Sequence, residues 1–231
     1  NAKEYSRYSL NLPSLQEQEK VLSLFKSFDQ KINLLTKKKE ALETYKKGLM
    51  QKIFSQELRF KREDGTDYPE WELVGFESIL IPRSERNKRS ELTEVYSVSN
   101  KDGFIPQTKQ FDGYSVASSD VSNYKLVYPN DIVYNPSRIN VGSIAVNETN
   151  GIKIVSPLYN IFRVDGGYNS SFWFMLKELH YFKHLVNISC SGSVRDSLSL
   201  DDLLSFNMNL PSVDEERRIE IKKLIKSMGE K

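Results

Sequence analysis

The chain has 231 residues, of which 39% are hydrophobic and 28% charged, with a formal net charge of +2 and a single cysteine, Cys190. This composition excludes a disordered tail, a collagen-like fibre and a disulfide-stapled miniprotein, because the apolar fraction is large enough for a core and one thiol cannot form an internal disulfide. No apolar run approaches the ~18 residues of a membrane span, and no basic-then-apolar leader opens the chain. We therefore expect a soluble cytoplasmic protein with no membrane partner. Its first residue, Asn1, is compatible with a processed or truncated start.

Charge is distributed unevenly along the chain. Residues 15–62 carry twelve Lys or Arg residues against six acidic ones, whereas residues 63–207 carry thirteen against nineteen. A basic segment followed by a mildly acidic one indicates two organisational units, not one uniform fold.

The basic segment has the pattern of one long helix. Residues 15–55 contain no proline, and their apolar positions recur at spacings of three and four, which is typical of coiled-coil pairing. Ser14 is the predicted N-cap, with Glu17 as its capping-box partner. The alternative is a long helix buried within a core. The residues predicted to pair with a partner helix are Val21, Phe25, Phe28, Ile32, Leu35, Leu42, Leu49 and Ile53.

Beyond residue 58 the pattern changes to short β-branched or alternating runs separated by turn signals. Residues 171–185 and 199–204 have helical patterns, the second with Ser199 as N-cap. We predict an α+β fold, in which a mixed, mostly β domain over residues 59–207 is attached to a long coiled-coil-forming helix over residues 15–58. The predicted strands lie within residues 71–81, 95–98, 124–128, 132–134, 143–146, 152–155 and 160–164.

An internal repeat gives the chain its organisation. Residues 10–17 read LNLPSLQE and residues 208–215 read MNLPSVDE, at a constant offset of 198. Both copies are predicted to open a helix after the Asn-Leu-Pro-Ser turn, so the chain has the pattern of one period of a duplicated protein. We assign residues 1–14 to the tail of a preceding domain and residues 208–231 to the start of a second helix.

Several motifs together resemble one family. Residues 12–21 read LPSLQEQEKV, and residues 45–54 read YKKGLMQKIF, followed by Arg59-Phe60, Asp64-Gly65 and YPEW at 68–71. The runs DIVYNPSR at 131–138, VGSI at 141–144 and VSP at 155–157 lie in the predicted strands and loops. These segments are similar to the conserved helix and recognition domains of type I restriction-modification specificity subunits. The resemblance covers nearly the whole chain, and the end of the helix is its most specific part.

The resemblance implies an architecture and a set of partners. A specificity subunit alternates two DNA target recognition domains with two conserved helices that pack as an antiparallel coiled coil, and each domain reads one half of a bipartite site. It implies a non-catalytic chain that binds double-stranded DNA, docks type I methyltransferase subunits and, through the complex, a motor/nuclease subunit. It also implies that S-adenosylmethionine, ATP and Mg belong to those partner subunits, with no cofactor in this chain. Both a fragment and a natural half-subunit, which would pair with a second copy through the long helix, fit the sequence.

Three segments carry residues suited to DNA contacts. Arginine can bind guanine bidentately, asparagine can bind adenine in the same way, and small residues allow close approach to phosphate. The alternative for each segment is an ordinary solvated loop, a turn held by Asn and Ser side chains, or a flexible connector. The candidate residues are Arg83, Arg86, Lys88 and Arg89 in the first segment, Asn135, Ser137, Arg138 and Asn140 in the second, and Ser193 and Arg195 in the third.

The sequence argues against catalysis in this chain. Residues 135–138 superficially resemble the Asn-Pro-Pro-aromatic motif of amino-methyltransferases, but Ser137 and Arg138 replace the second proline and the aromatic residue, and no Gly-x-Gly loop is present. His180 and His184 have metal-ligand spacing without a third ligand, so we predict no metal site. The net acidity of residues 63–207 is unfavourable for DNA binding unless the basic residues share one face. A coiled-coil scaffold without sequence-specific DNA binding is therefore the alternative function.

Overall fold

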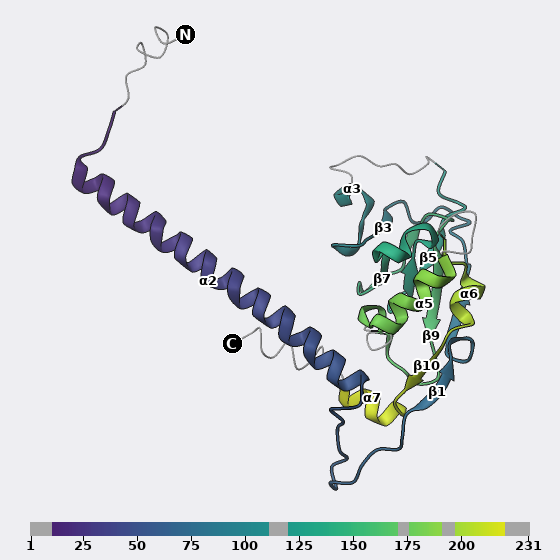
Figure 1. Ribbon diagram of the computed structural model, residues 1–231. Coiled ribbons are helices and arrows are strands. Elements are labelled where there is room, and N and C mark those ends of the chain that lie inside the picture. The colour runs from purple at the N-terminus through teal and green to yellow at the C-terminus, as the bar shows by residue number, and fades with distance from the viewer. Residues whose placement is uncertain (1–10, 111–119, 171–175, 191–196, 220–231) are drawn as a thin grey trace. The chain divides into compact units, whose positions relative to one another are not determined.

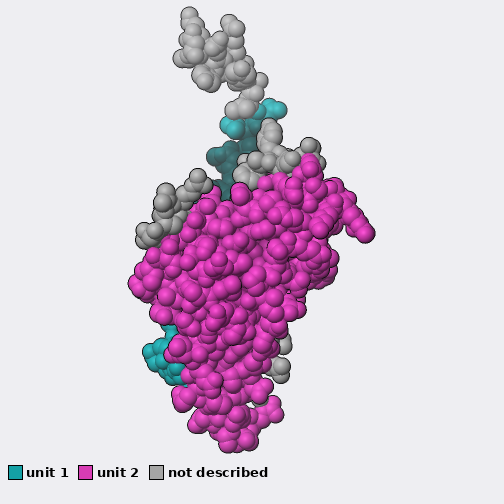
Figure 2. All heavy atoms as spheres, turned by 90° about the vertical axis from the view of Figure 1, so that its right-hand side faces the viewer, with its two compact units in different colours: residues 1–59 teal, residues 60–231 magenta. Residues whose placement is uncertain are grey.

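The computed structural model of the chain describes residues 11–110, 120–170, 176–190 and 197–219. The chain separates into two compact units, residues 1–59 and residues 60–231, which Figure 2 shows in different colours.

Over residues 11–59, the part of the first unit that the structure describes, there is one helix, α2 (Leu15–Phe54), labelled in Figure 1. Forty residues at 1.5 Å each give a rod of about 60 Å. The predicted capping box is confirmed, because Ser14 Oγ accepts from the backbone N–H of Glu17 and the Glu17 carboxylate accepts from the backbone N–H of Ser14 at 2.9 Å. These bonds satisfy N–H groups that a helix start otherwise leaves unpaired.

In the described part of the second unit the strands form two four-stranded sheets and one two-stranded sheet. In the first sheet all neighbouring strands are antiparallel, and in the second β3 and β8 run parallel while the other pairs are antiparallel. The first sheet has the order β2 (Leu80–Arg83), β9 (Asn160–Val164), β6 (Ile132–Tyr134), β7 (Ile144–Val146). The second has the order β4 (Gly103–Pro106), β3 (Val95–Ser99), β8 (Lys153–Val155), β5 (Lys125–Val127). The two-stranded sheet pairs β1 (Glu72–Gly75) with β10 (Asn207–Leu210) (Figure 1).

The helices of the second unit are short. The Ser199 side chain accepts from the Asp202 backbone N–H at the start of α6, which confirms its predicted N-cap role. The helices are η1 (Phe76–Ser78), α3 (Gln107–Gln110), η2 (Pro136–Val141), η3 (Leu176–Glu178), α5 (His180–Cys190), α6 (Leu200–Leu204) and α7 (Val213–Ile219).

The two four-stranded sheets share one apolar core. Its buried residues come from both sheets, and Tyr96 and Val98 of β3 belong to the same cluster as Val133 of β6 and Ile161 of β9. A second apolar contact joins three aromatic rings, Phe76, Phe182 and Phe206, whose centroids lie 6.2 to 6.5 Å apart. Tyr96 also stacks on Phe104 at 4.9 Å. Burial of aromatic rings contributes strongly to the stability of such cores.

The predicted α+β class is confirmed, and most predicted strands are present. Strands β6 and β9 have the predicted bounds, whereas β4 and β10 were not predicted. The helix predicted over residues 171–185 is wrong in its extent, because the described part is the short η3 followed by α5, which continues to Cys190. Phe182, Val186 and Cys190 recur every four residues and are all buried, so packing extends the helix past its predicted end.

The second copy of the repeat is anchored in the domain. Helix α7 begins at Val213, which is 198 positions after Leu15 at the start of α2, so both copies open a helix as predicted. The buried Glu215 carboxylate accepts from Trp71 Nε1 at 3.1 Å, and Tyr168 Oη donates to the Pro211 carbonyl at 2.9 Å. Residues 208–210, assigned in the sequence to the second helix segment, instead lie in strand β10.

Candidate functional site

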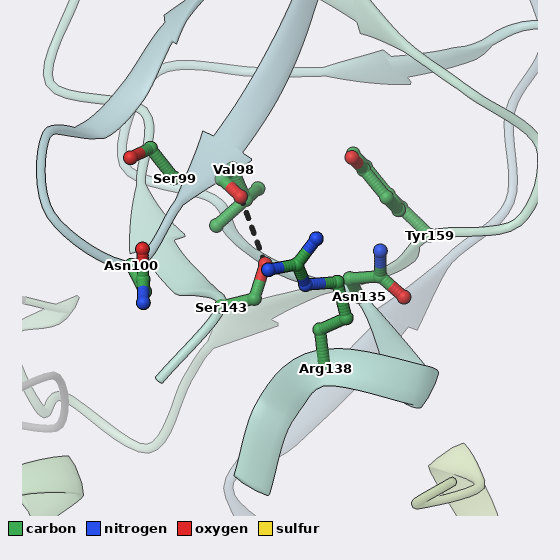
Figure 3. A pocket seen from close by; sticks show the side chains of 7 residues that line it. All are labelled: Val98, Ser99, Asn100, Asn135, Arg138, Ser143 and Tyr159. Carbon is green, nitrogen blue, oxygen red and sulfur yellow. Dashed lines mark hydrogen bonds between the residues drawn. The ribbon is translucent and has the colours of Figure 1, made fainter. Parts of the chain in front are cut away.

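A polar recess of about 150 Å³ opens where strand ends of the two four-stranded sheets come together (Figure 3). It combines the end of β3 and the turn after it, the segment between β6 and β7 that contains η2, and the residue before β9. A cavity of this size is smaller than the ~300 Å³ at which pockets for whole small molecules begin, so it fits the edge of a larger partner. The lining residues are Val98, Ser99, Asn100, Asn135, Arg138, Ser143 and Tyr159.

Helix η2 places Arg138 in the recess. Asn135 caps this helix, because its Oδ1 accepts from the Ser137 backbone N–H at 3.1 Å, and Pro136 occupies the first turn, where a missing N–H costs nothing. Gly142 ends the helix with φ of 92°, a left-handed conformation that favours glycine. The Asn-Pro-Ser-Arg sequence and the glycine four positions after Arg138 therefore determine the local backbone.

Ser143 links the two sheets below the recess. Its buried hydroxyl donates to the Val98 carbonyl of β3 at 2.8 Å, as the dashed line in Figure 3 shows. On the other side, Ser99 Oγ accepts from the backbone N–H groups of Lys101 and Asp102 and donates to the Asp102 carboxylate at 3.2 Å. Both serine hydroxyls are thus occupied by internal bonds and hold the walls in place.

Arg138 is the available cation of the recess. Within the part of the chain that the structure describes, its guanidinium makes no hydrogen bond or ion pair, and Figure 3 shows it extending between Asn135 and Ser143. The Asn100 amide is likewise without a described partner, and Asn135 retains its Nδ2 as a donor. None of the lining residues is acidic, histidine or cysteine, and the side chains of Asn100, Asn135 and Arg138 can recognise hydrogen-bonding edges.

Arg83 is held by the domain itself, contrary to its predicted place in a contact loop. It ends strand β2, and its Nε lies 3.1 Å from Oδ1 of the buried Asp131. Its guanidinium also lies over the Tyr128 ring, 4.6 Å from the centroid, and Tyr128 in turn donates its hydroxyl to Glu85 at 2.7 Å. Burial raises the pKa of the Asp131 carboxyl, although the Tyr128 backbone N–H and Arg83 oppose that rise. Arg83 therefore compensates a buried acid.

The other basic residues of the first predicted segment do not line the recess. Arg86 donates to the Asn123 carbonyl at 2.9 Å, and Arg89 lies 3.7 Å from Glu91 in an exposed pair. Lys88 is exposed. The buried Asn87 side chain bonds to the backbone at Leu92 and Val121, and this internal anchor shapes the loop.

The remaining predicted contacts divide into three cases. Asn135 and Arg138 lie together in the recess, whereas Ser137 and Asn140 are exposed on η2 outside its lining. Ser193 and Arg195 lie outside the described residues. Asn100 and Tyr159 also line the recess but carry no sequence signal for a contact residue; the signal near Asn100 is the turn at Asp102-Gly103.

The apolar seam of α2 is exposed over its first half. Five of its predicted residues, Val21, Phe25, Phe28, Ile32 and Leu35, have exposed fractions between 49% and 61%. Leu42 and Leu49 are half-buried. Ile53, unlike these, is buried at 1% exposure, and its part in helix pairing stays a prediction.

Two further expectations concern metals and membranes. Among residues 11–110, 120–170, 176–190 and 197–219, no group of three potential metal ligands occurs, and His180 and His184 are exposed on α5. No helix in the described part of the chain is long and apolar enough to cross a membrane.

Comparison with known proteins identifies relatives over nearly the whole chain, although no family model matches it. The MjaX type I restriction enzyme specificity subunit of Methanocaldococcus jannaschii is 25% identical over 95% of this chain and 52% of its own length. The MjaVIII specificity subunit of the same organism is 26% identical over 92% of this chain and 54% of its own length. The predicted resemblance to type I specificity subunits is confirmed. The chain spans about half the length of these curated relatives.

A solved structure shares the fold. The crystal structure of a type I restriction-modification system S subunit from M. genitalium superposes with a TM-score of 0.60 at 12% identity, covering 93% of this chain and 55% of that one. At this identity the likeness concerns the fold alone.

Proposed function

We propose that this chain acts in the cytoplasm as a DNA sequence-specificity component of a type I restriction-modification complex, without catalytic activity of its own. The second unit would read one half of a bipartite target in double-stranded DNA. The similarity to two named specificity subunits over more than nine-tenths of the chain supports this function. The observation that carries it is the recess, where two asparagine amides lie together with an arginine that has no hydrogen bond or ion pair among the described residues.

The long helix would act as spacer and docking element. A helix with exposed Phe25, Phe28 and Ile32 leaves apolar area in water that a partner helix would bury. In this proposal the partner is the helix of a second copy or of a linked half, and the assembled pair docks the methyltransferase subunits and, through them, the motor/nuclease subunit. S-adenosylmethionine, ATP and Mg²⁺ would be bound by those subunits.

A selection from a random-sequence duplex library tests the DNA-reading function. The full chain is incubated with the library, and the bound duplexes are sequenced and their affinity measured at several salt concentrations. We expect enrichment of a short motif and an affinity that falls as salt rises, because phosphate contacts release counterions. Binding without enrichment would contradict sequence reading, and absence of binding would favour the scaffold alternative.

Methylation mapping tests the docking function. The chain is co-expressed with a type I methyltransferase subunit, and N6-methyladenine is located by sequencing. A bipartite palindromic motif would indicate that two copies pair and read identical half-sites, as two-fold symmetry requires. A lack of new methylation would contradict productive docking by this chain.

Helix pairing has its own test. Phe28→Glu places a charge in the exposed seam and should abolish association, while Ser27→Glu, one residue away from the seam, serves as the matched control. Light scattering measures the mass of both variants. An associated mass that survives Phe28→Glu would refute pairing through this seam.

A further inference from the structure

We infer that the recess reads a single G·C base pair, with Arg138 donating to the guanine and Asn100 accepting from the cytosine. This inference rests on the proposed DNA-reading function and specifies the base pair that this site recognises. It also adds Asn100, which the sequence patterns did not indicate, as a specificity-determining residue.

The first step is the availability of the donors. Arg83, Arg86, Arg89 and Arg163 each bind a partner inside the domain, but Arg138 has no hydrogen bond or ion pair among the described residues. Its position on η2 is fixed by the Asn135 cap at one end and Gly142 at the other. An arginine held by a rigid backbone and lacking an internal partner can present its planar fork to two acceptors.

The second step is the position of the acceptor. Gly142, at the end of η2, lies against Asn100, because a Cβ at Gly142 would be 3.8 Å from the Asn100 Cβ. Asn100, in the turn after β3, and Arg138, on η2 after β6, both line this small recess (Figure 3). The Asn100 side chain has no described hydrogen bond, so its amide oxygen is available to accept.

The third step is the match to a base-pair edge. In the major groove a G·C pair presents two acceptors, guanine N7 and O6, followed by one donor, cytosine N4. In the recess the Arg138 guanidinium supplies two donors and the Asn100 amide oxygen one acceptor, which together complement this edge. The Asn135 Nδ2, the Asn100 Nδ2 and the Tyr159 hydroxyl are further hydrogen-bonding groups of the lining. The Ser99 and Ser143 hydroxyls are occupied by internal bonds, and Asn135 Oδ1 accepts from Ser137, so these groups do not alter that pattern.

A base edge fits the surroundings better than a phosphate. Phosphate oxygens only accept hydrogen bonds, and they are repelled by negative charge. The Asp102 carboxylate bonds to Ser99 at the wall of the recess, and residues 63–207 carry six more acidic than basic residues. A phosphate recess would instead gather several cations, whereas Arg138 is the only lysine or arginine in this lining.

The test compares the wild-type chain with Arg138→Ala, Arg138→Lys and Asn100→Ala, using the random-sequence duplex library as probe. Lys183→Ala, an exposed basic residue on α5 that does not line the recess, is the matched control. In Arg138→Ala we expect the preference for guanine over the other bases at one position to fall roughly 5- to 150-fold. The other positions of the motif should stay enriched. Arg138→Lys should lose it as well, since lysine keeps the charge but not the bidentate fork. Asn100→Ala should weaken discrimination at the same position.

Modified bases sharpen the result. Replacing the selected guanine by 7-deazaguanine removes N7 and should weaken wild-type binding, while inosine keeps N7 and O6 and should be tolerated. Neither change should affect Arg138→Ala further. Circular dichroism melting of each variant shows whether it is folded.

Each contrary outcome has a distinct meaning. Arg138→Ala could weaken binding to all sequences equally and reduce the slope of log affinity against log salt concentration by about 1. In that case Arg138 contacts a phosphate and the inference is overturned. The same holds if the folded variant keeps the guanine preference. If the wild-type chain enriches no motif, the proposed DNA-reading function itself fails.

Discussion

Replacing Arg83 should destabilise the second unit strongly. In Arg83→Ala the Asp131 carboxylate, which is 1% exposed, loses the cation 3.1 Å away and keeps the Tyr128 backbone N–H as a described donor. Removing one partner of a buried pair costs about 3–5 kcal/mol. The Arg83 side chain is 29% exposed, so water partly screens the pair and we expect a loss of about 2–3 kcal/mol in the free energy of unfolding.

Urea denaturation followed by tryptophan fluorescence measures this loss, since Trp71 is buried in the same unit. Arg89→Ala is the control, because its pair with Glu91 is exposed and should change the free energy by no more than about 0.5 kcal/mol. The double variant Arg83→Ala/Asp131→Asn tests the cause. It should be more stable than Arg83→Ala alone, because asparagine removes the uncompensated charge.

Two results would refute this reasoning. If Arg83→Ala unfolds at the same urea concentration as wild type, the ion pair does not stabilise the domain. If the double variant is no more stable than the single one, the loss comes from the packing of Arg83 on the Tyr128 ring and not from the buried charge.

Further outcomes follow from the same domain. Ser143→Ala leaves the buried Val98 carbonyl without its hydroxyl donor and should cost about 1–3 kcal/mol, measured by urea denaturation; an unchanged midpoint would contradict the link between the sheets. The raised pKa of Asp131 means that the folded state keeps this proton where the unfolded state has lost it. The contribution of Asp131 to the free energy of unfolding should therefore fall as the pH rises from about 3.8 through the native pKa. The measurement is the free energy of unfolding of wild type and Asp131→Asn at several pH values, and parallel profiles would be contrary evidence.

Local sequence signals predicted several elements well. The Ser14 and Glu17 pair predicted the start of α2, and the apolar runs predicted the bounds of β6 and β9. These signals succeed because a helix cap, a period-2 pattern and a heptad pattern each depend on residues that are close together in the sequence. Strand β4 was missed because Gly103 and Pro106 indicate a turn, and only pairing with β3 at the sheet edge makes this segment a strand.

The composition of the site was determined only in part by the sequence. Arg138 and Asn135 were predicted together because they share one short loop motif between two strands. Asn100 and Tyr159 line the same recess but come from distant segments of the chain, and no local sequence pattern predicts that they lie close together. Asn100 was followed by an Asp-Gly turn, which predicted the chain reversal but not what the asparagine faces.

The sequence by itself determined the class of protein, the long helix, the repeat and the kind of side chain suited to reading DNA. Only the tertiary structure decided which arginine is available. Arg83 and Arg138 have the same chemistry, but the fold places Asp131 against the first and no acid in the lining around the second. The physical reason is that a guanidinium binds the carboxylate, aromatic ring or carbonyl that the fold brings within a few ångströms. For Arg83 these neighbours, Asp131 and Tyr128, come from a segment more than forty residues away in the sequence.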